Sequence, residues 1–128
     1  MQTFQNILLV GAGGFIGSIL RYLVSGWAVH IFKSTQLPIG TMVVNILGSL
    51  LLGILGGFSD HIQIFSPNIR LLLFVGLLGG FTTFSTFGYE TITLLRNDQI
   101  FLAFINVGVQ LFVGFGAVYL GYNFSKLF

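Results

Sequence analysis

The residues best suited to chemistry lie within one apolar segment, over residues 79–90, which reads GGFTTFSTFGYE. Phe84 and Phe87 are three residues apart, so on a helix they share a face. The positive edge of an aromatic ring can contact an anion without a formal charge. Ser85 and Thr86 add hydroxyl donors beside the two rings. Core packing is the more common reason for phenylalanines at this spacing, but the density of hydroxyl groups and glycines favours an anion-binding function.

The same segment predicts an interruption of a helix over residues 79–83. Gly79 and Gly80 are followed by two β-branched residues, Thr82 and Thr83, and both residue types are poor helix formers. Within a membrane, backbone outside a helix persists only where it is buried in protein or lines a cavity. The carbonyl groups that such a break frees can together bind a cation.

Arg21 and Asn45 are polar residues within other apolar segments. A charge in the membrane interior costs at least about 2.5–3.5 kcal/mol, so Arg21 should face protein or water. We expect it to attract anions in a polar vestibule; the alternative is a side chain that extends to the membrane surface. The amide of Asn45 can donate two hydrogens to an anion. It can also join two helices, which is the more common role of such a residue.

Polar residues also recur in the last apolar segment, where Asn106, Gln110 and Gly114 are four residues apart. This spacing places them on one face of a helix. The resulting polar stripe either lines water or faces Asn45, and the sequence leaves both alternatives open.

The composition identifies the class of protein. Hydrophobic residues make up 55% of the 128-residue chain and charged residues only 6%, whereas about a quarter of a soluble domain is charged. The chain is therefore predicted to be an integral membrane protein. Five basic residues without a cluster exclude a nucleic-acid surface. Cysteine is absent, and His30 and His61 have no triad or metal-ligand partners, so we predict no enzyme activity.

Four apolar segments each approach or exceed the roughly 20 residues that a helical membrane span needs. They cover about residues 4–32, 37–58, 68–95 and 100–124. Short connections use up the rest of the chain. We predict an all-α protein in which residues 1–128 form a single four-helix transmembrane domain, with several spans in the cell membrane.

The charges in the connections predict the orientation of the spans. Four spans place Arg70 and Lys126 on one side of the membrane and Lys33 and Arg96 on the other. The positive-inside rule therefore has almost no bias to act on. We expect the chain to insert in both orientations and to form an antiparallel homodimer, the arrangement that inverted repeats give in transporters. The alternative is a fixed topology set by weak signals.

Three motifs together resemble the CrcB/Fluc family of fluoride channels. They are GGFIGSILRY at 13–22, GTMVVNILG at 40–48 and GGFTTFSTF at 79–87, and the resemblance covers the whole chain. It implies a fluoride-selective passive channel that exports toxic fluoride and works as a dual-topology homodimer. This last property agrees with the loop charges.

The resemblance also assigns roles to single residues. It implies that fluoride passes Asn45 and the rings of Phe84 and Phe87, and that a structural sodium ion at the dimer centre is bound by backbone carbonyls. The residues implied are, for the fluoride path, Asn45, Phe84, Phe87, Ser85, Thr86, Arg21 and Glu90, and, for sodium, Gly79 and Thr82. The fourth segment departs from the family, which often has hydroxyl residues along the ion path where this chain has Asn106, Gln110 and Gly114; Asn106 and Gln110 are the candidates for the pore lining there.

Two other functions are compatible with the sequence. A small dual-topology, proton-coupled exporter needs a titratable carboxylate in the membrane, and Glu90 is the only candidate. Glu90 lies near the end of its segment, with no aromatic cage for an organic cation. A purely structural subunit would explain the spacing of the glycines but not the polar stripes.

Overall fold

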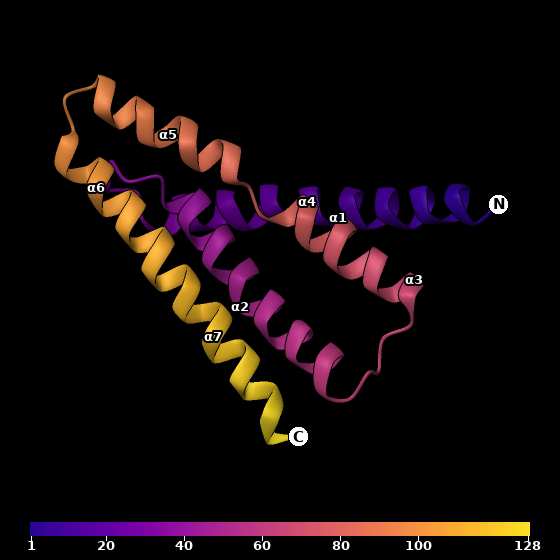
Figure 1. Cartoon of the computed structure of the whole chain (residues 1–128). Helices are drawn as coiled ribbons and strands as arrows, with labels where there is room; N and C mark the ends of the chain where they lie inside the picture. The colour runs from indigo at the N-terminus through magenta and orange to yellow at the C-terminus, as the bar shows by residue number, and fades with distance from the viewer.

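The computed structural model describes residues 1–128, and its regular structure is entirely helical. Four helical segments are long and apolar enough to cross a membrane, which confirms the predicted all-α architecture with four spans (Figure 1). The segments are Gln2–Ile31, Ile39–His61, Pro67–Arg96 and Ile100–Leu127.

The first two spans are single helices, α1 (Gln2–Ile31) and α2 (Ile39–His61). Pro38 directly precedes α2, where its fixed φ angle and missing amide hydrogen suit the start of a helix. The C-terminal turns of α1 and α2 carry His30 and His61, residues whose protonated forms interact favourably with the negative end of a helix.

The third span is divided by two residues in extended conformation. Thr82 has φ −84° and ψ 159°, and Thr83 has φ −151° and ψ 112°, so neither continues the helix. The predicted break is therefore confirmed, but only at these two residues. The segments of the span are α3 (Pro67–Arg70), the π-helix η1 (Leu71–Leu78), α4 (Gly79–Phe81) and, after the break, α5 (Phe84–Arg96).

Gly79 and Gly80 are helical, so the expectation that they form part of the break was wrong. Gly80 instead allows the third span to approach α1 closely, because a Cβ atom on Gly80 would lie 2.7 Å from the carbonyl oxygen of Gly14. A Cβ atom on Gly76 would likewise lie 2.8 Å from the carbonyl oxygen of Val10. Small residues at helix interfaces permit this backbone-to-backbone packing in a membrane.

The fourth span is continuous and also contains a π-helical segment. It consists of α6 (Ile100–Gly108), the π-helix η2 (Val109–Val113), α7 (Gly114–Phe124) and a 3₁₀ turn, η3 (Ser125–Leu127). Gln110 lies in η2, and π-helical turns are frequent at functional sites.

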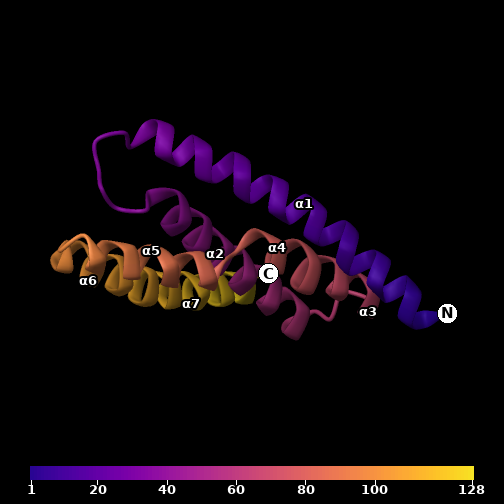
Figure 2. The ribbon, with the colours of Figure 1, turned by 90° about the horizontal axis from the view of Figure 1, so that it is seen from above.

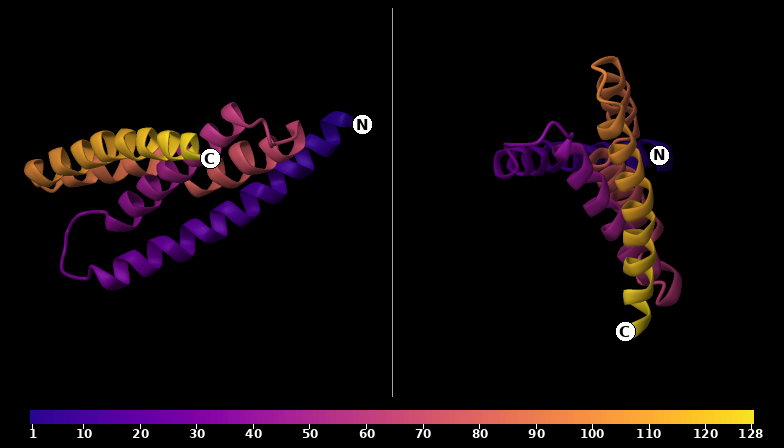
Figure 3. Two further views of the ribbon diagram at one scale, coloured as in Figure 1. Left: turned by 90° about the horizontal axis from the view of Figure 1, so that it is seen from below. Right: turned by 90° about the vertical axis from the view of Figure 1, so that its left-hand side faces the viewer.

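The spans are arranged unequally around the break. The helices α2 and α7 lie side by side, and α1 packs along η1 and α4 (Figure 2). By contrast, α5 packs mainly on α6, and the two extend away from α1 (Figures 1 and 3). Between 11% and 33% of each span's most apolar window is buried within the chain. Most of the apolar surface thus remains available for lipid or for another protein surface.

Candidate functional site

The site is built around the break in the third span, where Asn45 pairs with the backbone of Thr83. The amide of Thr83 donates to Oδ1 of Asn45 at 2.8 Å, and Nδ2 of Asn45 donates to the carbonyl oxygen of Thr83 at 3.0 Å. The Thr83 hydroxyl oxygen also accepts from the amide of Thr86 at 3.2 Å, which caps the N-terminus of α5. The break is therefore held by specific hydrogen bonds.

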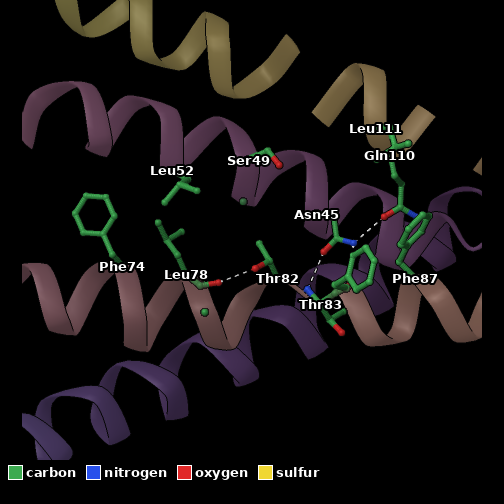
Figure 4. Close-up of a pocket in the computed structure, with 13 residues that line it drawn as sticks. Asn45, Ser49, Leu52, Phe74, Leu78, Thr82, Thr83, Phe87, Gln110 and Leu111 are labelled. Carbon is green, nitrogen blue, oxygen red and sulfur yellow. Dashed lines mark hydrogen bonds between the residues drawn. The ribbon is translucent and has the colours of Figure 1, made fainter. Parts of the chain in front are cut away.

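A cavity of about 320 Å³ lies beside the break; we call it the amide cavity (Figure 4). It is formed by residues of α2, the third span and the fourth span. Six of its lining residues were predicted from the sequence as binding residues: Asn45, Gly79, Thr82, Phe84, Phe87 and Gln110. Three segments far apart in the chain thus meet at one cavity.

Phe84 and Phe87, two of the three phenylalanines that line this cavity, differ in their surroundings. Their ring centroids are 5.6 Å apart, and the ring planes make an angle of 57°. Phe87 is only 9% exposed, whereas Phe84 is 80% exposed. The ring of Phe84 therefore offers a large apolar surface at the mouth of the cavity.

Gln110 connects Asn45 to a chain of polar side chains. Nδ2 of Asn45 donates to Oε1 of Gln110 at 2.7 Å, and Nε2 of Gln110 donates to Oδ1 of Asn106 at 2.8 Å. Nδ2 of Asn106 donates to the Thr91 hydroxyl oxygen at 2.9 Å, and that hydroxyl donates to the carbonyl oxygen of Phe87 at 2.8 Å. We call this series the amide chain. It joins α2, η2, α6 and α5.

A second cavity, of about 350 Å³, is lined by two charged residues, Arg21 and Glu90; we call it the charged cavity. Arg21, Thr86 and Glu90 line it, as do Thr41 and Thr83. The Thr41 hydroxyl donates to Oε1 of Glu90 at 2.8 Å, while Oε2 of Glu90 is buried without a partner. Because Thr83 lines both cavities, the break forms part of the wall between them.

Two predicted residues lie outside both cavities. Ser85 is exposed, and its hydroxyl lies 3.3 Å from that of Thr83. Asn106 is completely buried and lies within the amide chain. Of the two alternatives for the polar stripe, the structure shows the one in which Gln110 faces Asn45.

Sequence reasoning missed two participating threonines. Thr41 bonds Glu90, 49 residues away, and no local pattern in the sequence connects the two. Thr91 had no signal of its own, because a single threonine in a helix usually bonds only its own backbone.

The end of α4 offers backbone oxygens near the amide cavity. The last carbonyls of a helix have no amide partner within it. The carbonyl of Gly79 would normally accept from the amide of Thr83, but that amide donates to Asn45. Gly79 and Thr82 also line the amide cavity. Uncharged oxygens of this kind are suitable ligands for a hard cation.

Comparison with known proteins gives consistent matches. Residues 8–122 match the family model described as CrcB-like protein, Camphor Resistance (CrcB). The chain is 46% identical over 116 residues to the "Fluoride-specific ion channel FluC 1" of Methanosarcina acetivorans, which covers 91% of this chain and 87% of the relative. It is 42% identical over 127 residues to the FluC protein of Clostridium perfringens, covering 99% and 98%. For the FluC protein of Shewanella woodyi the identity is 44% over 125 residues, covering 96% and 99%.

Proposed function

The chain belongs to the CrcB family of multi-pass membrane proteins, and on this basis we propose that it is a passive, fluoride-selective ion channel that lets a cell lose fluoride. The observation that carries the proposal is the pair of cavities that meet at Thr83. The relatives named above as fluoride-specific channels, which align over most of the chain, support the choice of ion.

The proposed path runs through both cavities. Arg21 attracts the anion into the charged cavity, where the hydroxyl of Thr86 offers a donor. The ion then passes Thr83 into the amide cavity, beside the rings of Phe84 and Phe87. Fluoride is small and strongly hydrated, so the protein must replace its water with close donors and ring edges. A narrow path would exclude larger anions.

A direct test is fluoride efflux from liposomes that contain the purified protein, followed with a fluoride electrode. We expect efflux well above that of protein-free liposomes, and no comparable efflux of chloride from matched vesicles. If chloride leaves as readily as fluoride, the proposed selectivity is wrong.

We further propose that two antiparallel copies assemble. The 80% exposure of the Phe84 ring at the cavity mouth supports this, because a second copy would cover it and complete the path. The chain has no cysteine, so Ser34→Cys, in the connection between α1 and α2, introduces a single label site. A membrane-impermeant maleimide should label about half of the molecules from either side of the membrane. Labelling from one side only would contradict the antiparallel arrangement.

A structural sodium ion between the two copies is the third part of the proposal. The carbonyls of Gly79 and Thr82, at the end of α4 and in the break, would hold it. The ion would bind these carbonyl oxygens and join the two copies. Replacing sodium by N-methyl-glucamine should lower the thermal stability of the dimer. Unchanged stability would remove the support for this site.

A second candidate function is proton-coupled export through Glu90. The buried, unpartnered Oε2 atom of this side chain is the observation that favours it. Glu90→Gln separates the two functions, because glutamine keeps an oxygen that can accept from Thr41 but cannot release a proton. A channel should retain fluoride efflux within about fivefold, since a change in one such hydrogen bond is worth about 1 kcal/mol. Abolished transport would favour the exporter.

A further inference from the structure

Asn45 has no free hydrogen-bonding hydrogen. Its amide nitrogen carries two hydrogens, and these are donated to the carbonyl of Thr83 at 3.0 Å and to Oε1 of Gln110 at 2.7 Å. Its oxygen accepts from the amide of Thr83 at 2.8 Å. An anion can therefore receive a hydrogen from Asn45 only if one of these bonds breaks.

Backbone groups at both ends of the amide chain determine which atom donates and which accepts in each of its hydrogen bonds. The amide of Thr83 can only donate and its carbonyl can only accept, which sets the orientation of Asn45. At the other end, the hydroxyl of Thr91 donates to the carbonyl of Phe87, so its oxygen must accept from Asn106. The amides of Gln110 and Asn106 then have one consistent orientation each.

This orientation leaves one free amide hydrogen at the amide cavity. Nε2 of Gln110 donates one hydrogen to Asn106, and its second hydrogen has no acceptor. Asn106 also has a spare amide hydrogen, but the residue is completely buried and does not line the cavity. Gln110 does line it, together with Phe84 and Phe87 (Figure 4).

We propose that Gln110 is the amide donor that contacts the permeating anion, and that Asn45 positions it. This inference rests on the proposed channel function and names the group that selects the ion. Asn45 holds Oε1 of Gln110, which leaves Nε2 as the donor end of a side chain that lines the amide cavity together with Phe84 and Phe87. Asn45 at the same time secures the break through Thr83.

The test compares a substitution in the amide chain with a matched substitution outside it, in the liposome efflux assay at a series of fluoride concentrations. Gln110→Met keeps the length of the side chain and removes every donor. It should lower fluoride efflux about tenfold or more and raise the half-saturating fluoride concentration, because a hydrogen bond to a charged group is a strong one. The control, Asn123→Leu, removes an amide side chain of α7 that lines neither cavity and bonds the carbonyl of Tyr119, so efflux should stay within about threefold.

A third variant separates contact with the anion from support of Asn45. Gln110→Glu keeps an oxygen that can accept from Asn45 but replaces the donating nitrogen, so it should lose efflux as Gln110→Met does. Thermal melting of each purified variant shows whether the fold is retained.

Three results would overturn the inference: efflux by Gln110→Met equal to that of the parent chain, efflux retained by Gln110→Glu, or equal losses in Gln110→Met and Asn123→Leu, which would show that the loss is not specific to Gln110. A parent chain that moves no fluoride would instead refute the proposed function.

Discussion

The two halves of the third span differ in how they are held. The first half, Pro67–Phe81, packs through glycines against the backbone of α1. The second half, Phe84–Arg96, lies mainly against α6 and is fixed by side-chain hydrogen bonds at Glu90 and Thr91. One half is a scaffold held by close contact, and the other carries the polar and aromatic residues of the site.

This difference has a physical cause. Glycine contacts between helices depend on van der Waals packing, which has no directional requirement and is effective in lipid. They therefore suit a segment that serves only as a scaffold. Buried hydrogen bonds are directional and leave unpaired groups when one partner is lost, so they specify one geometry. Glycine packing supports the span before the break at Thr82 and Thr83, and side-chain hydrogen bonds support it after the break.

The largest effect should come from adding a methyl group to the first half. Gly76→Ala places a Cβ atom 2.8 Å from the carbonyl oxygen of Val10 and 2.9 Å from the Cα atom of Gly13. Because both are backbone atoms, we expect a loss of about 1–3 kcal/mol or more in stability, visible in the thermal melt and in the yield of folded protein in detergent. The matched change in the second half, Gly88→Ala, meets nothing within 4 Å and should not destabilise the protein. Equal effects would show that the halves are supported alike.

The next largest effect is on fluoride efflux and comes from the two phenylalanines of the second half. Phe84→Ile and Phe87→Ile remove the ring edges but keep apolar side chains, so fluoride efflux from liposomes should fall about tenfold or more if each ring edge supplies about 1.4 kcal/mol. Phe84 is 80% exposed, so its substitution should leave the thermal stability of a single chain nearly unchanged. Intact efflux in both variants would remove the rings from the proposed path.

The smallest effects come from the two helix caps. The hydroxyl of Thr83 accepts from the amide of Thr86 at 3.2 Å, and that of Ser66 accepts from the amide of Ile69 at 3.4 Å. Thr83→Val should cost about 1 kcal/mol of stability. Ser66→Ala, at the more exposed and longer bond, should cost about 0.5 kcal/mol or less. Denaturant unfolding followed by circular dichroism measures both, and a larger loss for Ser66→Ala would reverse the comparison.

The sequence predicted the four spans, the break and six of the 13 residues that line the amide cavity, because each has a local signal. Length and hydropathy identify a span, and a run of hydroxyl residues between apolar ones marks Thr82 and Thr83. The positions of Gly79 and Gly80 were misjudged, because the same residue either interrupts a helix or packs a neighbouring one closely. Gly80 lies against the backbone of α1, whereas Gly79 has no close neighbour there and is still helical.

The links between side chains were beyond local sequence signals. Thr41 meets Glu90 across 49 residues, and Asn106 meets Thr91 across 15. Such pairs depend on how the spans pack, and a lone threonine or asparagine in a helix carries no sign of its partner. Both amide hydrogens of Asn45 are donated, one to the third span and one to the fourth, and no local pattern in the sequence indicates this.

The central claim is that the two cavities form a passive path selective for fluoride. The most direct measurement is the reversal potential of the purified protein in a planar lipid bilayer, with fluoride on one side and an equal concentration of chloride on the other. We predict a large potential, with the sign set by fluoride alone. A reversal potential at zero, or a protein that carries no current and moves fluoride only with a proton gradient, would contradict it.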